Sequence, residues 1–193
     1  MKKTGFLYDE RYLLHDTGEG HPETSDRLIA IFKGIESAGL LKKVKHFKAK
    51  LADMKWIKII HSEKYIRRFE EVCLCGNTSF DTADNRICTE TYDTAFLAVG
   101  GVLDMARRVM QNELDNAFCA VRPPGHHAEK DEGMGFCYFN NIAICAKYLQ
   151  IQWEIERVMI IDFDVHHGNA TQHSFESDPT VFYYSIHEHP SFA

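Results

Sequence analysis

The stretch RVMIIDFDVHHGN, from Arg157 to Asn169, joins a short apolar run to a cluster of acidic and imidazole side chains. A continuous apolar run of this kind is typical of a strand in a parallel sheet, which is buried on both faces. Because side chains alternate along a strand, Asp162, Asp164 and His166 are expected on one side of the chain. The stretch therefore predicts a buried strand whose carboxyl end brings together two carboxylates and an imidazole.

Further short apolar runs alternate with helical patterns along the chain. Strands are expected near residues 5–8, 117–121, 157–165 and 180–186, and helices over 92–110, 141–149 and 169–175, with earlier helices after Thr24 or Ser25, Asp53 and Ser62. The polar segment 75–91 is expected to form a loop, and Gly100-Gly101 in the longest helix indicates close packing against a neighbour. The alternation predicts an α/β fold with a central parallel sheet that helices flank on both faces.

Length and composition restrict the class of protein. The 193 residues have the size of a single domain, and the formal net charge of -6 lacks the basic excess that is typical of nucleic-acid binders. Direct nucleic-acid binding is therefore disfavoured. The sequence has no apolar span of membrane-crossing length and no signal-peptide core, which predicts a cytoplasmic protein that does not associate with a membrane. The six cysteines lack paired spacing and are expected to be reduced.

A second polar motif, RPPGHHAEKDEGMGF at residues 122–136, follows the strand expected at 117–121. Ligands of parallel sheets gather at the carboxyl ends of the strands, so this motif is expected beside the one that begins at Asp162. A carboxylate and an imidazole suit zinc, iron(II) or another divalent metal, with Asp164 and His166 as two of three protein ligands. The adjacent His126 and His127 can then take a proton from water and protonate the amine that leaves an amide.

Simpler explanations exist for both motifs. Asp162 could be a buried carboxylate that backbone N–H groups satisfy, His166 could cap a helix, and the paired histidines could bond to carbonyls in an exposed loop. Gly168 favours a site, because glycine lets the backbone turn tightly beside one. The occurrence of both motifs at neighbouring strand ends favours the metal site over these alternatives.

Three motifs resemble, in their order and spacing, those of the metal-dependent histone deacetylase superfamily, which includes bacterial deacetylase-like amidohydrolases and acetylpolyamine amidohydrolases. They are RPPGHHA from residue 122, GFCYFNN from residue 135 and DFDVHHGN from residue 162, and the similarity extends from YDERYLLHDTGEGHPETSDRL to VFYYSIHEHP. The resemblance implies the arginase-deacetylase α/β fold. It also implies removal of acetyl groups from acetylated lysine side chains or acetylated polyamines.

The resemblance assigns catalytic roles by position. Asp164 and His166 resemble two of the family's three zinc ligands. His127 resembles the general base, and His126 resembles its electrostatic partner. Asp162 would then orient His126 by a hydrogen bond that fixes its tautomer and its basicity.

Substrate and ion sites follow from the same resemblance. The Gly135 carbonyl matches an acceptor for the substrate amide, Phe136 matches an apolar wall of the substrate tunnel, and Arg27 matches an arginine on the acetate side. Structural potassium is also implied, at one site formed by Asp162, Asp164, His166, Ser185 and Ile186 and at another formed by Phe175, Asp178 and Val181.

The sequence departs from the family pattern in two ways. Asn169 stands where some members have an aspartate, which places the chain nearer the class II and bacterial branches and gives His127 a hydrogen bond without a charge. The family's third metal ligand and its transition-state tyrosine would lie downstream of SIHEHP, residues 185–190. Residues 1–193 are therefore expected to be an N-terminal portion of a single catalytic domain, incomplete at its C-terminal end. A truncated protein that binds ligands or a partner without hydrolysing them is the alternative.

Other features leave choices open. A two-metal, arginase-like site is disfavoured, because it would need a further aspartate where Gly168 stands. Either Asp81 or Asp84 could be the aspartate that grips substrate at the rim of the tunnel, and His187 with His189 more often indicates a structural or rim role than a separate site. The sequence does not decide between protein and small-molecule substrates, and it does not fix the native metal or the oligomeric state.

Overall fold

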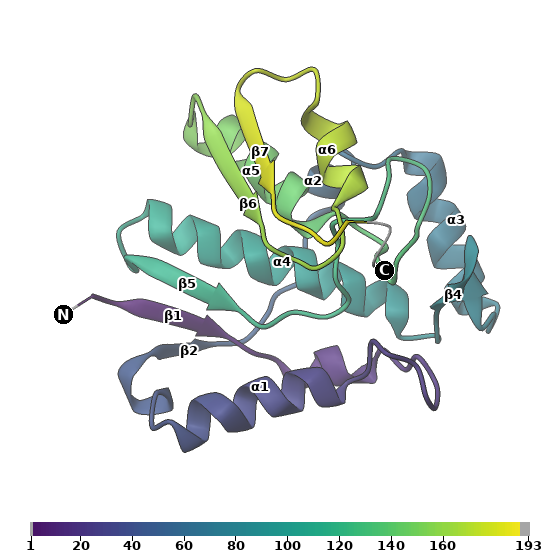
Figure 1. Cartoon of the computed structure of the whole chain (residues 1–193), viewed down its shortest axis with the longest axis horizontal. Helices are drawn as coiled ribbons and strands as arrows, with labels where there is room; N and C mark the ends of the chain where they lie inside the picture. The colour runs from purple at the N-terminus through teal and green to yellow at the C-terminus, as the bar shows by residue number, and fades with distance from the viewer. Residues whose placement is uncertain (1, 190–193) are drawn as a thin grey trace.

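The structure is a computed structural model that describes residues 2–189 (Figure 1). Its strands form two parallel sheets and one short antiparallel hairpin, and helices pack against the parallel sheets. The expected α/β class is therefore confirmed. The parallel strands lie in two separate sheets, however, where the sequence predicted a single central one.

The first sheet has the order β2-β1-β5, with β1 at Thr4–Leu7, β2 at Lys45–Phe47 and β5 at Asn116–Cys119. Both strand pairings are parallel. Alternation along β1 directs Phe6 toward α1 (Asp26–Ser37), where its ring centroid lies 6.4 Å from that of Phe32. Leu7 points to the other face and contacts α4 (Thr91–Met110) beside Gly101. Helices thus cover both faces of this sheet (Figure 1).

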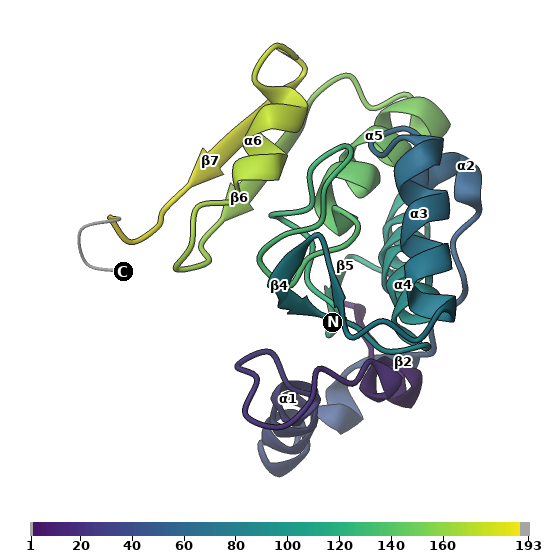
Figure 2. The same cartoon turned by 90° about the vertical axis from the view of Figure 1, so that its right-hand side faces the viewer.

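The second sheet pairs β6 (Val158–Asp162) with β7 (Val181–Ser185) in parallel. One face packs on α5 (Asn141–Trp153) and α6 (Asn169–Phe175). The opposite face, which we call the open face, carries large hydrophobic side chains that are 48–85% exposed: Met159, Ile161, Phe163, Val165, Phe182, Tyr184 and Ile186. Figure 2 shows β6, β7 and α6 together at one side of the molecule, next to α5.

Short elements complete the fold. They are the 3-10 helices η1 (Glu10–Leu14) and η2 (Leu41–Lys43), the helices α2 (Met54–Ile57) and α3 (Glu63–Leu74), and the hairpin of β3 (Ser79–Phe80) and β4 (Thr82–Arg86). The ring of Phe69 on α3 stacks on Tyr138 at 4.9 Å, and both side chains are buried. This aromatic contact fixes α3 against the segment that leads into α5.

Most helix and strand positions agree with the sequence prediction. Ser62 caps α3 by accepting from the backbone N–H of Tyr65, and Asp53 caps α2 in the same way through Lys55. The sequence prediction missed β2, which is three residues long, and the β3-β4 hairpin, which lies in the segment expected to be a loop. Both consist of short runs of mixed polarity, so they lack the alternation or the apolar run that marks a strand.

The two glycines of α4 let this helix lie very close to neighbouring segments of the core. A Cβ atom at Gly100 would lie 2.0 Å from the Lys50 carbonyl oxygen and 2.4 Å from the Ala52 nitrogen. A Cβ atom at Gly101 would lie 2.6 Å from side-chain atoms of Leu7 and Tyr12. The expected close packing at this pair of glycines is confirmed, and its partner is the backbone of residues 50–52.

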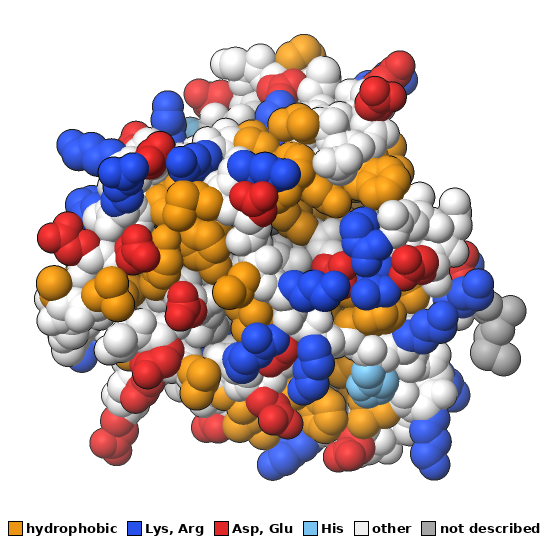
Figure 3. Space-filling view, turned by 180° about the vertical axis from the view of Figure 1, so that it is seen from behind, with side chains coloured by type: hydrophobic (Ala, Val, Ile, Leu, Met, Phe, Trp, Pro, Cys, Tyr) orange, Lys and Arg blue, Asp and Glu red, His pale blue; other side chains and the backbone are white. Residues whose placement is uncertain are grey.

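The surface of the described residues is mixed in charge on the side opposite Figure 1. Figure 3 shows Lys and Arg side chains interspersed with Asp and Glu side chains and with small hydrophobic patches. Among residues 2–189, no helix combines the length and the apolar character that are required to cross a membrane. All six cysteines are present as thiols without a disulfide partner.

Two histidines, His15 and His61, are fully buried in the core. Burial lowers the pKa of His61 to about 4, and burial together with the nearby Arg122 guanidinium lowers the pKa of His15 to about 3. His61 uses both ring nitrogens: Nδ1 donates to the Glu129 carbonyl oxygen at 2.8 Å, and Nε2 accepts from the Asn140 N–H at 2.9 Å. The ring is therefore neutral and connects two loops.

Acidification is expected to destabilise the fold through these two histidines. Their pKa values lie below the usual 6.5, so the unfolded chain binds more protons than the folded chain once the pH falls below 6.5. Each group then removes about 1.4 kcal/mol of stability per pH unit until its folded pKa is reached. Urea denaturation between pH 7.5 and 5 should show this decline. His61→Gln should reduce its slope, whereas His46→Gln, at an exposed position on β2, should not; equal slopes in all three proteins would contradict the assignment.

Candidate active site

The candidate site begins where β6 ends at Asp162 and the chain turns toward α6. The carboxylate of Asp162 accepts from the backbone N–H of Asp164 at 3.1 Å, and the carboxylate of Asp164 accepts from the backbone N–H of His166 at 2.8 Å. The Asp164 Oδ1 atom also lies 3.1 Å from Nδ1 of His166. These local bonds bring the two carboxylates and the imidazole together, as the sequence predicted.

His126 and His127 lie beside these residues, in the loop that follows β5. The backbone N–H of Thr171 on α6 donates to the His126 carbonyl oxygen at 3.3 Å, which fixes this loop against α6. Nδ1 of His126 lies 3.0 Å from Oδ2 of Asp162, and its Nε2 lies 3.9 Å from Oδ1 of Asp164. The two strand-end motifs therefore meet, and His126 donates a proton to the Asp162 carboxylate through Nδ1.

His127 has a different partner. Its Nδ1 lies 2.5 Å from Oδ1 of Asn169, and its ring centroid lies 4.1 Å from that of His126 and 6.1 Å from that of His166. Burial lowers the pKa of His127 below its usual value, the imidazoles of His126 and His166 add to this effect, and the bond to Asn169 opposes it. A neutral His127 that donates through Nδ1 keeps a free lone pair at Nε2 for a proton.

Asp162 is held by three donors. Burial opposes its ionisation, but hydrogen bonds from His126, the Asp164 N–H and the Tyr183 hydroxyl at 3.0 Å together keep the pKa of its carboxyl below the usual value. Gly168 packs directly against this group: a Cβ there would lie 2.4 Å from Asp162 Oδ2 and 2.9 Å from His126 Nδ1. The φ of Gly168 is -77°, which any residue adopts, so the position requires glycine for space and not for a tight turn.

Replacing Gly168 by alanine is expected to separate His126 from Asp162. The added methyl group needs the space that the hydrogen-bonded side chains occupy, so the bond should lengthen or break and the free energy of unfolding should fall by about 1–2 kcal/mol. In the wild-type chain the His126 Nδ1 proton should give a strongly deshielded NMR signal, which the variant should lose. Tyr183→Phe removes another donor to Asp162 without filling this space and should keep the signal. Retention of the signal in Gly168→Ala would contradict this geometry.

The carboxylate of Asp164 and the imidazole of His166 are suited to two ligand positions of a zinc ion. A carboxylate oxygen and an imidazole nitrogen are preferred zinc ligands, and these two atoms lie together on side chains that are 49% and 66% exposed. Within residues 2–189, however, no group of three His, Cys, Asp or Glu side chains is arranged to hold a metal. The described residues therefore supply part of a metal site.

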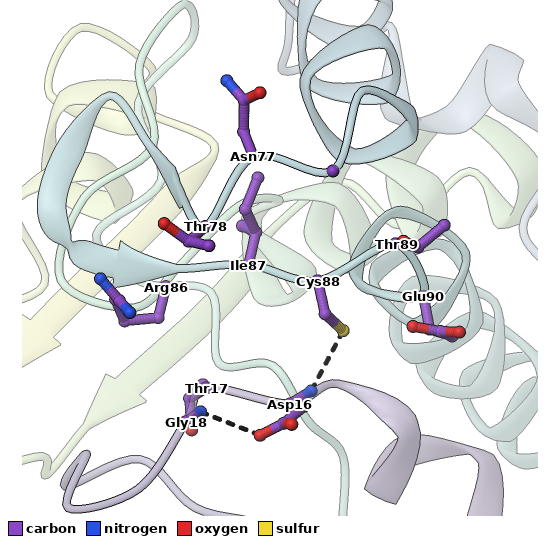
Figure 4. Close-up of a pocket in the computed structure, with 11 residues that line it drawn as sticks. Asp16, Thr17, Gly18, Asn77, Thr78, Arg86, Ile87, Cys88, Thr89 and Glu90 are labelled. Carbon is purple, nitrogen blue, oxygen red and sulfur yellow. Dashed lines mark hydrogen bonds between the residues drawn. The ribbon is translucent and has the colours of Figure 1, made fainter.

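A hollow of about 470 Å³ adjoins these groups. Its lining combines His126, Asp162 and Asp164 with apolar side chains of β6, the following loop and α5, namely Ile142, Ile160, Ile161, Phe163 and Val165. A second hollow of about 330 Å³ lies elsewhere, between the loop at Asp16, the end of α3 and the end of β4 (Figure 4). There the Cys88 sulfur accepts from the Asp16 N–H at 3.2 Å. The two hollows share no lining residue, so the strand-end chemistry belongs to the first.

Gly135 and Phe136 lie against the candidate base. Both have positive φ, 55° and 67°, and a Cβ at Gly135 would lie 2.3 Å from the His127 ring, so the backbone here packs closely against that imidazole. The Phe136 N–H donates to Asn85 Oδ1 at 2.6 Å, and its ring meets that of His21 edge-on at 4.7 Å. The Gly135 carbonyl oxygen accepts from the Cys137 thiol at 3.3 Å. This arrangement is compatible with the expected tunnel wall, whose role stays a prediction.

Comparison with known proteins identifies the family. The sequence model described as the histone deacetylase domain matches residues 21–193. The chain belongs to the histone deacetylase domain family. It is 38% identical over 193 residues to a probable deacetylase of the archaeon Archaeoglobus fulgidus, which covers 97% of this chain and 52% of that protein. It is 37% identical over 203 residues to histone deacetylase 5 of Arabidopsis thaliana. That alignment covers 98% of this chain and 30% of the plant protein.

Comparison with solved structures identifies the same family. A crystal structure of the HDA15 HD domain matches with a TM-score of 0.92 and 34% sequence identity, covering 97% of this chain and 54% of that chain. The fold class expected for a histone deacetylase is thereby confirmed. The chain spans about half the length of this domain and of the archaeal relative, and less of the plant protein.

Arg27, in the first turn of α1, is exposed and bonds to the segment that follows β5. Its guanidinium donates to the Glu23 carboxylate at 3.2 Å and to the Val121 carbonyl oxygen at 3.1 Å. A second arginine, Arg122, is fully buried and also binds Glu23, through Nε at 2.9 Å. The sequence analysis missed Arg122, although it starts the RPPGHHA motif. The buried charge pair explains how the segment before the paired histidines is anchored.

The residues expected around potassium are adjacent in space, but several oxygens already have partners. The backbone N–H of Ile186 donates to the Asp162 carbonyl oxygen at 2.9 Å, next to Ser185. At the second position, the Phe175 carbonyl accepts from the Asp178 N–H, and the Asp178 carbonyl accepts from the Val181 N–H. The Asp178 carboxylate binds Lys147 Nζ at 2.6 Å, which holds its pKa at about 2. Potassium therefore stays a prediction at both positions.

The two open choices at the rim are separated by the structure. The Asp81 carboxylate binds Arg68 and accepts from the Gly133 N–H at 2.8 Å, so it ties α3 to a loop. Asp84 is exposed, and its carbonyl oxygen accepts from His21, the ring that packs on Phe136. Asp84 therefore holds the His21 ring that contacts Phe136, and the role of either aspartate at the rim stays a prediction. The ring centroid of His187 lies 4.7 Å from that of His167, and its Nδ1 lies 2.8 Å from the Ser185 hydroxyl.

Three residues that serve the candidate site were absent from the sequence prediction: His61, Glu129 and His173. Glu129 accepts from the Asn169 amide at 2.6 Å and lies 2.8 Å from His173 Nδ1. Two signals could have identified this group. Glu129 belongs to the motif RPPGHHAE, and His173 is four residues after Asn169, which places both on one face of a helix.

Proposed function

We propose that this chain carries the proton-transfer groups and two of the metal ligands of a metal-dependent amidohydrolase, which removes acetyl groups from acetylated lysine side chains or acetylated polyamines. The observation that carries the proposal is that two adjacent histidines at one strand end have different hydrogen-bond partners. His126 donates to the carboxylate of Asp162, and His127 donates to the amide oxygen of Asn169. Membership of the histone deacetylase family supports acetylated substrates.

In this mechanism His127 is the general base and acid. Its Nδ1 proton is engaged by Asn169, so Nε2 receives a proton from the water that attacks the acetyl carbonyl carbon. The same nitrogen then delivers the proton to the amine as the carbon-nitrogen bond breaks, which gives acetate and a free amine. His126, whose Nδ1 donates to the Asp162 carboxylate, would stabilise the negative charge that develops on the acetyl oxygen in the transition state.

Asp164 and His166 would hold the metal, which is zinc in this proposal, although iron(II) or another divalent ion could use the same donors. When bound, the ion lowers the pKa of water and polarises the substrate carbonyl. The Asp164 carboxylate contacts both the backbone N–H and the ring of His166. These contacts keep the two proposed metal ligands close together. Structural potassium near Asp162 and near Asp178 belongs to the same proposal.

Substrate binding is proposed for the residues beside His127. The close packing of Gly135 on the imidazole places its carbonyl beside His127, and this carbonyl keeps a second lone pair for the substrate amide N–H. The Phe136 ring would form the apolar wall, positioned by His21 and Asn85. Arg27 of α1, which donates to the Val121 carbonyl oxygen after β5, would face the acetate product.

Residues 1–193 are proposed to be part of one catalytic domain, to which a further segment contributes. The open face of β6-β7 exposes seven large hydrophobic side chains, and β5 and β6 each pair with one strand only within residues 2–189. Exposed apolar faces of this size are normally covered in a folded protein. A polypeptide that adds strands here, continuous with this chain or separate, could also supply a third metal ligand.

A second candidate function is binding of acetylated ligands or a partner without hydrolysis. The observation that favours it is the absence, in the described part of the chain, of a three-residue metal site. The two candidates differ in turnover. Acetate release should be measured from an acetyl-lysine peptide and from N-acetylputrescine, with zinc and with a chelator. Zinc-dependent release supports the hydrolase and identifies the substrate class; binding of either compound without release supports the second candidate.

A further inference from the structure

The Asn169 side chain lies between the candidate base and a carboxylate. Its Oδ1 atom is 2.5 Å from Nδ1 of His127, and its amide nitrogen is 2.6 Å from Oε1 of Glu129 and 3.4 Å from the Met134 sulfur. The Glu129 carboxylate oxygen that accepts from Asn169 also lies 2.8 Å from Nδ1 of His173. Four side chains thus form a continuous hydrogen-bonded row from His127 to the exposed His173.

The orientation of the Asn169 amide decides the tautomer of His127. An amide has an accepting end and a donating end, and an imidazole nitrogen that faces the oxygen must carry the proton. If the amide turned over, its NH₂ group would face Nδ1, and the proton would move to Nε2. The nitrogen proposed to take a proton from water would then already be occupied.

Glu129 blocks this turnover. A carboxylate only accepts hydrogen bonds, so it holds the Asn169 NH₂ group and would repel the amide oxygen. The Met134 sulfur, the other neighbour of the amide nitrogen, is also an acceptor. Both groups behind Asn169 therefore favour the orientation in which Oδ1 points to His127.

The frame around Glu129 is rigid. Its backbone N–H donates to the Glu132 carbonyl oxygen, and its own carbonyl oxygen accepts from the buried His61. The other nitrogen of His61 accepts from the N–H of Asn140, whose side chain donates to Thr171 on α6 at 3.1 Å. The loop that carries Glu129 and the helix that carries Asn169 are thereby fixed to the same buried residues.

We propose that Glu129 is a positioning residue that sets the tautomer of His127 through the amide of Asn169. The catalytic consequence rests on the proposed function, because it requires His127 to be the base. The tautomer itself does not depend on turnover. A purely structural role for Glu129 would be to anchor α6 through its pair with His173, and that role would leave the tautomer unchanged.

The tautomer is measured by NMR on the chain labelled with ¹⁵N-histidine, using long-range correlations between ring protons and both ring nitrogens at pH 7.5. The His127 signals are identified as those that His127→Ala removes. In the wild-type chain, Nδ1 should be protonated and Nε2 unprotonated. In Glu129→Ala the two nitrogens should shift toward the reverse pattern or toward a mixture. Glu129→Gln, which can still offer an oxygen to Asn169, should restore much of the wild-type pattern.

His173→Ala is the matched control. It removes the hydrogen bond from α6 to Glu129 but leaves the contact between Glu129 and Asn169, so the His127 tautomer should stay as in the wild-type chain. An unchanged tautomer in Glu129→Ala, with the variant folded by circular dichroism, would overturn the inference whatever the turnover. A shifted tautomer in a chain that releases no acetate would support the inference and count against the proposed function alone.

Discussion

Replacing His127 by alanine is expected to lower the turnover number for acetate release by about 10²- to 10⁴-fold, the range for loss of a general acid-base group. The reason is that Asn169 engages the Nδ1 proton of His127, which leaves the Nε2 lone pair of this ring to take a proton from water. The KM should change little, because the ring's proposed part in the reaction is proton transfer and not substrate binding. Steady-state acetate release from an acetyl-lysine peptide gives both values.

His46→Ala serves as the control for this substitution, since His46 lies exposed on β2 and its ring bonds to the Leu41 carbonyl oxygen, away from the candidate site. It should retain wild-type turnover. A His127→Ala protein that keeps near-full activity would show that proton transfer is performed by another group, and the assignment of the base would be wrong.

Gly100→Ala is expected to destabilise the chain by about 3 kcal/mol or more. The added Cβ would approach three backbone atoms of residues 50–52 at 2.0–2.6 Å, and backbone cannot move aside as a flexible side chain can. The gain in helix propensity, about 1 kcal/mol, opposes this effect but is smaller. Urea denaturation followed by circular dichroism measures the change in the free energy of unfolding.

Gly34→Ala is a matched control for this prediction. Gly34 lies within α1, and a Cβ there would meet no atom within 4 Å. The substitution should therefore stabilise the chain by up to about 1 kcal/mol through helix propensity alone. If the two substitutions changed the stability by the same amount, α4 would not cross residues 50–52 as closely as described.

The strand-end site could be predicted from the sequence because each half of it is local. The spacing of Asp162, Asp164 and His166 follows from a strand end, and His126 with His127 follows another strand. One topological rule, that the carboxyl ends of parallel strands meet, was enough to bring them together. The pairing of His126 with Asp162 then depended on the resemblance to deacetylases, and the structure has this contact at 3.0 Å.

Features that depend on contacts between distant segments could not be predicted. Glu129 is next to the paired histidines in sequence, but its partner is Asn169, which lies 40 residues further along the chain. Gly168 was expected to allow a tight turn. Its φ is one that any residue adopts, and the Asp162 carboxylate occupies the space that a side chain at this position would need. The separation of the strands into two sheets also has no local signal, because β5 and β6 both have the apolar character of buried strands.

We expect Asp164 and His166 to hold a metal beside His126 and His127. Titration with zinc in competition with a chromophoric indicator tests this most directly, for the wild-type chain, His166→Ala and His167→Ala. His167 is the matched control, since it is the next residue and bonds to Gln172. The wild-type chain and His167→Ala should bind one zinc ion with similar affinity, and His166→Ala should lose this binding. Equal zinc binding by all three proteins would contradict this assignment.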